Sequence, residues 1–301
     1  MRLEDAVSPV IGLMLILTIL VSVIALLNAT YIPGLKQQSE IDHLAKVEEA
    51  FSAMSSDIER IIAFGEESIV RERLPLGGGD VVFSGLRSSG TVRIDSDIPL
   101  TPVTWMIYNN SFWQDVPVPL VTITYQPVGN FWQNQGYIWH NGLLNVTKGD
   151  RTTWLTYGDG SDADTTMSDF ILALSPITYD TVEGNLTHIT VSPVSLVQDV
   201  DALFTSSNGV GTVTLHMTDE TGIETIRPDA LGIAISDFLS CNERIRQEYI
   251  KLFTDIAQSG NCNGPVEGVI DGREGIYLTF DNSVQPVTVT MVRRNLTISA
   301  S

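Results

Sequence analysis

The feature that most constrains this chain is an uncharged apolar run close to its amino terminus. Val10 to Leu27 reads VIGLMLILTILVSVIALL, eighteen residues without an acidic or basic side chain. A helix of about 20 apolar residues crosses the ~30 Å hydrocarbon core of a bilayer, so the run has the length of a membrane-spanning helix. A cleaved secretory signal, with cleavage after Ala29, is the weaker interpretation. The apolar core of such a signal has about 7–15 residues, and Arg2 is the single basic residue before the run.

The residues that lead into the run carry a more specific signal. Asp5 to Gly12 reads DAVSPVIG, and this motif, followed directly by the apolar run, resembles the start of archaeal type IV pilins and pilin-like surface proteins. Further along, Tyr125–Leu144 (YQPVGNFWQNQGYIWHNGLL) is similar to a segment of large pilin-like surface proteins of euryarchaea.

The resemblance implies a processing and assembly route. Residues 1–6 would be a leader that a prepilin-type leader peptidase removes on the cytoplasmic side, between Ala6 and Val7 or one residue earlier. Residues 7–30 would then span the membrane before assembly and form the filament core afterwards, with further copies of the chain as partners in a helical homopolymer. The residues expected in this assembly helix are Val10, Ile11, Gly12, Leu13, Leu15, Ile19 and Ile24.

A second helical pattern follows Pro33-Gly34, where we expect the helix to kink or to be interrupted. Seven apolar residues recur at steps of three and four, the spacing of one helix face. The pattern predicts an amphipathic stalk over residues 35–66, within an N-terminal helical unit of residues 7–73. The stalk face fits packing on the chain's own head or on neighbouring subunits of a filament, and both can hold along different turns. Its residues are Ile41, Leu44, Val47, Phe51, Met54, Ile58 and Ile61.

The chain changes character after a Pro and three glycines within Leu74–Asp80. Short runs rich in Val, Ile, Thr and aromatic residues then alternate with turn residues, which predicts an antiparallel, β-sandwich-like head over residues 80–301. The pattern leaves open whether the head is one domain or two. Ser236–Gln258 has the spacing of one helix that covers the sheet, so the fold class is α+β. Six expected strands are Thr91–Asp95, Leu120–Tyr125, Ile189–Pro193, Gly211–Met217, Ile276–Phe280 and Val287–Arg293.

Two cysteines, Cys241 and Cys262, flank the expected covering helix. An extracytoplasmic location permits a disulfide. A helix that runs unbroken between them would hold the two Cα atoms far beyond the ~7 Å limit for a disulfide. Pairing therefore requires a helix that starts late or a following loop that folds back along it, and the sequence leaves both alternatives open.

Several short motifs suggest modification or ligand binding. Asn28 also starts an N-x-[ST] sequon, but it ends the apolar run and is the least suitable acceptor. An acidic segment with Asp159, Asp162 and Asp164 could bind calcium through carboxylate oxygens, although it lacks the EF-hand pattern and fits a solvated turn better. We expect no other cofactor or metal. The N-glycosylation acceptors expected on exposed loops are Asn109, Asn145, Asn185 and Asn295.

Aromatic residues concentrate in one part of the chain. All five tryptophans lie between Trp105 and Trp154, and several tyrosines accompany them. They could form a platform for a carbohydrate or another surface ligand, but filling a wide sheet core explains them better. Trp132, in a turn-like segment, is the best candidate for an exposed ring.

Charge and motifs bound the function. The net charge of −19 excludes nucleic acid as an expected partner, because phosphate binding needs a basic face. The sequence lacks the common nucleophile, zinc-hydrolase and phosphate-loop motifs, so an enzyme is not expected. The resemblance implies a structural subunit, major or minor, of an archaeal surface filament with an adhesive role as a further expectation. The alternative is a membrane-anchored surface binding protein that does not polymerise, and a tethered extracellular enzyme is the least supported reading.

Overall fold

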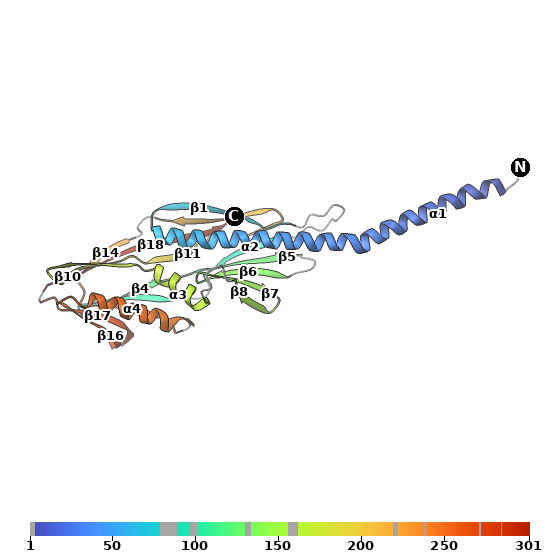
Figure 1. The fold of residues 1–301 in the computed structure, drawn as a ribbon. Helices are drawn as coiled ribbons and strands as arrows, with labels where there is room; N and C mark the ends of the chain where they lie inside the picture. Colours follow the sequence, from blue (N-terminus) through green and yellow to red (C-terminus); the bar gives the residue numbers. More distant parts are fainter. Residues whose placement is uncertain are drawn as a thin grey trace.

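The computed structural model describes residues 4–78, 89–96, 101–129, 134–155, 162–218, 222–237, 239–270, 272–283 and 285–301, and the statements below concern these residues. The chain consists of one long N-terminal helix and a β-rich head (Figure 1). The second half of the helix is built into the head, whereas the first half projects away from it. The α+β fold class is therefore confirmed.

The long helix continues through Pro33 without a break. It comprises α1 (Glu4–Leu26), a π-helical turn (Leu27–Tyr31) and α2 (Ile32–Phe64). Pro33 lies in the first turn of α2, where its lack of a backbone N–H group costs little, and the backbone before it follows the wider π-helical hydrogen-bond pattern. The expected kink therefore takes the form of a π-helical turn, at which the helix bends in Figure 1.

The helix ends at a glycine in the left-handed conformation. Gly65 has a φ of 61°, and its N–H group donates a 2.9 Å hydrogen bond to the carbonyl oxygen of Ile61. This conformation suits glycine, which lacks a Cβ atom, and it terminates the helix. The predicted stalk, residues 35–66, thus ends close to where the sequence pattern places it.

Three sheets form the head. In the largest, β18 (Thr288–Ala300) is the central strand, and its C-terminal half pairs with β13 (Val210–Met217). The strands of this sheet are β1 (Ser68–Pro75), β13, β18, β10 (Asn185–Val191), β9 (Ile177–Val182), β11 (Val194–Gln198) and β14 (Gly222–Ile226). A second sheet has the order β12 (Phe204–Ser207), β2 (Ser89–Asp95), β5 (Thr122–Val128), β6 (Gln135–His140), β7 (Leu143–Lys148) and β8 (Arg151–Trp154). The third has the order β16 (Cys262–Ile270), β17 (Arg273–Phe280), β15 (Ala230–Ile235), β3 (Val103–Asn109) and β4 (Phe112–Val118).

The strands follow from the alternation of apolar and polar residues. In β13, Val213, Leu215 and Met217 are fully buried, whereas Thr214 and His216 between them are partly exposed. All six strands expected from the sequence are present, with boundaries shifted by a few residues.

The pairing differs from the prediction at β18. Both β10 and β11 run parallel to this strand, so the head is mostly but not entirely antiparallel. β18 spans 13 residues, long enough to pair with different strands along its two halves. The sheets share one continuous hydrophobic core with α2, so the head is a single unit.

Two helices besides α2 pack on the sheets. The expected covering helix is α4 (Asn242–Ile256), shorter than the predicted Ser236–Gln258. Its Tyr249 and Phe253 pack on Trp105 of β3, with ring centroids 5.8 and 6.4 Å apart. The other helix, α3 (Ala163–Ala173), lies in the segment that the sequence analysis treats as an acidic loop and turn, and it contacts α4, β7 and α2.

The boundary assigned to the N-terminal unit is wrong. Residues 68–73, placed in the helical unit that ends at residue 73, belong to strand β1, which pairs with β13 along its whole length. The physical reason is an alternating pattern: Ile69, Arg71 and Arg73 are exposed, whereas the intervening side chains turn inward. The head therefore begins at β1 rather than at residue 80.

Candidate functional site

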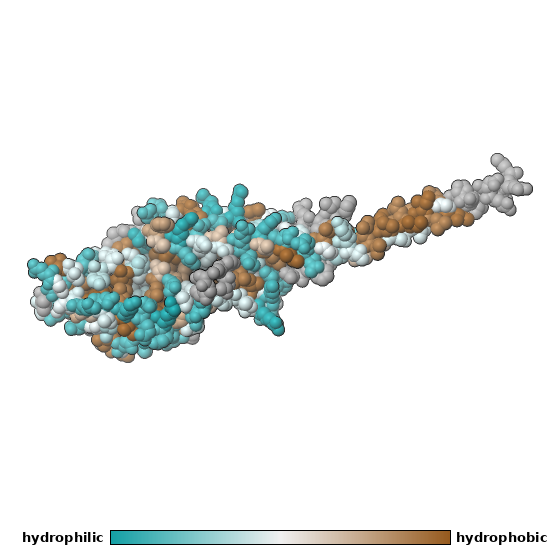
Figure 2. All heavy atoms as spheres, viewed as in Figure 1, coloured by the Kyte–Doolittle hydropathy of each residue, from teal (hydrophilic) through white to brown (hydrophobic). Residues whose placement is uncertain are grey.

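The most unusual surface of the molecule is the apolar helix α1. Fourteen large apolar side chains between Val10 and Leu27 are 48–69% exposed, and none of this segment is buried against the head. Figure 2 shows this segment as a mostly apolar rod that projects from a head of mixed hydrophilic and apolar surface. Soluble proteins rarely leave a contiguous apolar patch of this extent uncovered, so lipid or other protein must cover it.

The polar groups of this segment are satisfied within the helix. Thr18 donates a 2.8 Å hydrogen bond to the carbonyl oxygen of Met14, and Ser22 donates one of 2.8 Å to that of Thr18. No charged residue occurs between Asp5 and Lys36. The segment therefore places no unpaired side-chain donor in an apolar environment, as a bilayer or a packed helix bundle requires.

The length of the segment suits a bilayer. The helix is long and apolar enough to cross a membrane, and eighteen residues at 1.5 Å each span about 27 Å. Ala6 and Val7, the residues of the expected cleavage site, lie in the first turns of α1, and their side chains are outside the described part of the structure.

Gly12 lies on this helix with open space around it. A Cβ atom built at Gly12 has no neighbour within 4 Å, and the same holds for Gly34 at the start of α2. The single chain therefore gives no packing reason for either glycine. In an apolar medium, a small residue lets a second helix approach closely, and such a contact would use Gly12.

The stalk stripe packs inside the chain itself. Six of its seven residues are no more than 4% exposed, whereas Ile41, the one nearest α1, is 42% exposed. Helix α2 contacts β1, β6 and β7. Burying six large side chains contributes on the order of 10 kcal/mol before entropic costs. The buried six are Leu44, Val47, Phe51, Met54, Ile58 and Ile61.

Polar contacts fix the rotation of α2 on the second sheet. The single proton of the Tyr137 hydroxyl is shared between two acceptors, the Leu44 carbonyl oxygen and a Glu48 carboxylate oxygen, each 3.1 Å away, and the hydroxyl accepts a hydrogen bond from Gln135. His43 Nε2 lies 3.2 Å from the Tyr125 hydroxyl in the interior. Burial is the main cause that lowers the pKa of His43, with nearby Lys46 acting in the same direction. The helix that continues into α1 is therefore held at a fixed rotation by the head.

An acidic pair joins α2 to β1. The carboxyl of Glu72 on β1 shares a hydrogen bond with that of Asp57 on α2, and Arg60 forms an ion pair with Asp57. Burial, followed by the hydrogen bond and repulsion from Asp57, raises the pKa of Glu72 to about 7, against the opposing effect of Arg60. The hydrogen bond between the two carboxyl groups therefore forms when Glu72 is protonated.

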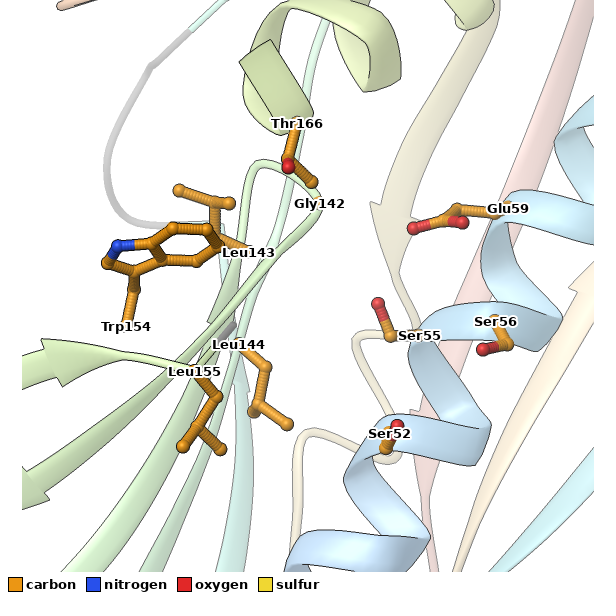
Figure 3. A pocket seen from close by; sticks show the side chains of 10 residues that line it. All are labelled: Ser52, Ser55, Ser56, Glu59, Gly142, Leu143, Leu144, Trp154, Leu155 and Thr166. Atoms are coloured by element: carbon orange, nitrogen blue, oxygen red, sulfur yellow. The ribbon is translucent and has the colours of Figure 1, made fainter. Parts of the chain in front are cut away.

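A cavity of about 220 Å³ opens to solvent beside the same helix (Figure 3). One wall is a face of α2 with Ser52, Ser55, Ser56 and Glu59, and the facing wall comes from β7 and from the end of β8. The sequence analysis did not find this site, because its walls are about 90 residues apart in the chain. The one local signal was the polar stripe on α2 at spacings of three, four and seven. The facing residues are Gly142, Leu143, Leu144, Trp154, Leu155 and Thr166.

Most of the described aromatic cluster fills the core. Trp105, Trp139, Tyr125 and Tyr137 are at most 1% exposed, and Trp113 packs against Tyr108 with ring centroids 4.8 Å apart and ring planes tilted by 43°. Trp154 is partly exposed at the cavity. Trp132, the residue expected to be exposed, lies outside the described residues.

Of the two alternatives that the sequence leaves open for the cysteines, the structure has the unpaired one. Cys241 and Cys262 are both free and buried. Cys241 lies at the N-terminus of α4 and Cys262 starts β16, so the whole of α4 separates them along the chain. Burial raises the pKa of Cys262 to about 11 and is also the main cause that raises the pKa of Cys241.

The four expected glycosylation acceptors lie at or within strands instead of on fully exposed loops. Asn109 ends β3 and Asn185 begins β10, and Asn145 and Asn295 lie within β7 and β18. All four are partly buried. Glycosylation at these residues stays a prediction.

The described acidic residues of the suggested calcium segment serve α3. Asp162 caps the helix by accepting a 2.7 Å hydrogen bond from the Thr165 N–H group. The hydrogen bond from the Thr165 side chain and this backbone bond together lower the pKa of Asp162. Asp164 accepts a hydrogen bond from Ser240. Asp159 lies outside the described residues, and within them no three His, Cys, Asp or Glu side chains come together as metal ligands.

Comparison with known proteins adds no relative. No family model matches the sequence, and neither a curated protein nor a solved structure matches the chain. The function must therefore be argued from the geometry of α1 and its connection to the head.

Proposed function

We propose that this chain is a structural subunit of an archaeal type IV pilus-like surface filament, assembled through its N-terminal apolar helix. The observation that carries the proposal is the state of α1, which is apolar on all sides and uncovered by its own head. The similarity of DAVSPVIG to archaeal type IV pilin starts gives that helix a specific use.

The energetics support a use in which the helix is always covered. Removing the fourteen half-exposed apolar side chains of Val10–Leu27 from water favours burial by on the order of 15 kcal/mol. Lipid can provide this cover before assembly, and neighbouring copies of the same helix can provide it in a filament core. The hydrogen bonds of Thr18 and Ser22 to their own backbone suit both environments.

The connection between α1 and the head favours a filament over a simple tether. The helix runs from Glu4 to Phe64 without a flexible linker, and its buried stripe is part of the head core. A tether has no need of a fixed orientation. In a helical polymer, by contrast, each subunit must place its head at a defined angle to its assembly helix, and a continuous helix does this.

The alternative function is a membrane-anchored surface binding protein that does not polymerise. The length of the apolar run favours it equally, because the same helix is sufficient to cross a bilayer. Under both functions the head lies outside the cell. The N-terminus is cytoplasmic in the membrane anchor, and in the filament subunit it is cytoplasmic until assembly.

Mass spectrometry of the mature amino terminus separates the two functions. A subunit processed like a pilin begins at Val7, or at Ala6 if cleavage falls one residue earlier. An intact chain from Met1 would contradict the filament proposal and favour the anchor, and a chain from Thr30 would contradict both. Negative-stain microscopy of shed surface material, with antibody to the head, then tests whether filaments contain the chain.

A further inference from the structure

We propose that the cavity between α2 and the β7–β8 hairpin binds one carbohydrate ring, with its hydroxyl groups toward α2 and its C–H face toward Trp154. The cavity is distinct from the assembly helix, and binding there does not depend on filament formation. Its two walls differ in chemistry in the way that a pyranose ring differs between its edge and its face (Figure 3).

The polar wall is formed by three serines and one glutamate of α2. Ser52, Ser55, Ser56 and Glu59 lie at spacings of three, four and seven residues on α2, which places them on one helix face. The small side chains of the three serines leave room between α2 and the hairpin, whereas the adjacent apolar stripe with Phe51 and Ile58 fills the core. The wall therefore offers several neutral hydroxyls and one carboxylate.

Ser55 shows which kind of ligand group suits this wall. Its Oγ already accepts a 3.0 Å hydrogen bond from Trp139 Nε1. The hydroxyl proton of Ser55 is thus available to a ligand acceptor. A sugar hydroxyl can accept this proton, whereas an ammonium or guanidinium group has no acceptor.

Glu59 supplies the complementary acceptor. Within the described residues, Glu59 forms no ion pair; its side chain is exposed to solvent, and the partial burial of its carboxyl beside the cavity raises the pKa of that group. Hydroxyl donors of a ligand would replace part of the lost hydration of the carboxylate. A ligand that both donates and accepts hydrogen bonds therefore matches Glu59 and Ser55 together.

The facing wall supplies the apolar contact. Leu143 and Leu144 are buried beneath it, and the indole ring of Trp154 lies partly exposed at its edge. An aromatic face next to aliphatic side chains packs well on the C–H face of a pyranose. The cavity volume of about 220 Å³ is smaller than the ~300–1,000 Å³ of sites for drug-sized ligands. The volume therefore suits a ligand of one sugar ring.

Ligand-observed NMR tests the proposal on the full-length chain in a detergent without a sugar headgroup. The probes are the methyl pyranosides of glucose, galactose, mannose and N-acetylglucosamine, each at about 10 mM, where a millimolar site is mostly occupied. We expect saturation transfer to the ring C–H protons of at least one probe. Trp154→Ala should weaken that binding at least about tenfold, and Glu59→Gln, which keeps the side-chain shape, several-fold.

Phe112→Ala is the matched control, because Phe112 is an aromatic residue 72% exposed on β4, outside the cavity. It should leave binding unchanged. The proposal is overturned if no probe binds the wild-type chain, or if Glu59→Gln and Trp154→Ala bind as the wild type does. Binding of lysine amide without any pyranoside would likewise overturn it and assign the cavity to a basic side chain.

Discussion

Replacing Phe51 by alanine tests whether the stalk stripe belongs to the head of its own chain. Phe51 is fully buried, and its ring lies 6.0 Å from Tyr137 and 6.4 Å from Tyr125 between centroids. A buried Phe→Ala change costs about 3–5 kcal/mol. Because two aromatic contacts are lost as well, we expect about 4 kcal/mol from Phe51→Ala. At about 2–4 °C per kcal/mol for a unit of this size, Tm should fall by roughly 8–16 °C.

The assay is thermal and urea unfolding of the full chain in detergent, followed by near-ultraviolet circular dichroism of the core aromatics. Ile41→Ala is the control on the same helical stripe, because Ile41 is 42% exposed and should cost less than about 1 kcal/mol. If both variants lose less than about 1 kcal/mol, α2 is not packed in its own head. The stripe would then be free for contacts between subunits.

Three further predictions concern assembly, pH and the thiols. Gly12→Leu and Gly34→Leu should both leave the Tm of the head unchanged, because neither site has a neighbour within 4 Å. Only Gly12→Leu should reduce the yield of filaments. Equal filament yields from the two variants would contradict a close helix contact at Gly12. Since the pKa of Glu72 rises from 4.5 to about 7 in the folded chain, its stabilising proton is present below pH 4.5 and is lost as pH rises through about 7. Glu72→Gln should therefore match the wild type in free energy of unfolding, measured by urea titration, at pH 4 and exceed it at pH 8 by up to about 1 kcal/mol after solvent screening. Parallel pH profiles would refute the pairing with Asp57. Cys241 and Cys262 are buried, and burial raises the pKa of both thiols, so neither should react with a thiol reagent in the native chain. After unfolding in denaturant, two thiols should react. No reaction in denaturant would indicate a disulfide.

The helical half of the fold was largely predictable because its signals are local. The uncharged run Val10–Leu27 and the spacing of the stripe from Ile41 to Ile61 each define a helix within a few turns of sequence. The strands were found through alternation, as in Gly211–Met217. The N-terminal end of the head was misplaced because β1 directly follows the helix, with Gly65 as the only turn signal.

Features that depend on distant partners were not predictable. The parallel pairing of β10 and β11 with β18 requires knowing which segments meet, and strand patterning does not give this. Helix α3 was missed because its cap, Asp162, lies in a stretch read as an acidic turn. The same apolar face of α2 would suit its own head or a neighbour, so only the three-dimensional arrangement could assign it.

The cavity illustrates the same limit at the level of a site. Ser52, Ser55, Ser56 and Glu59 read as the solvated flank of an amphipathic helix until the β7–β8 hairpin is placed opposite them. Trp154 likewise counted as one member of an aromatic cluster that mostly fills the core. Only the fold separates Trp154, at the cavity edge, from Trp105 and Trp139, which are fully buried.

Electron cryo-microscopy of filaments shed from the cell surface would show whether α1 is the interface through which the subunits assemble. A helical reconstruction should place Val10–Leu27 of every copy in a continuous core, with Gly12 at a close contact between neighbouring helices and the β-rich heads outside. Filaments built from head-to-head contacts with α1 outside the core would contradict the account. So would a chain found only as a monomer in the membrane.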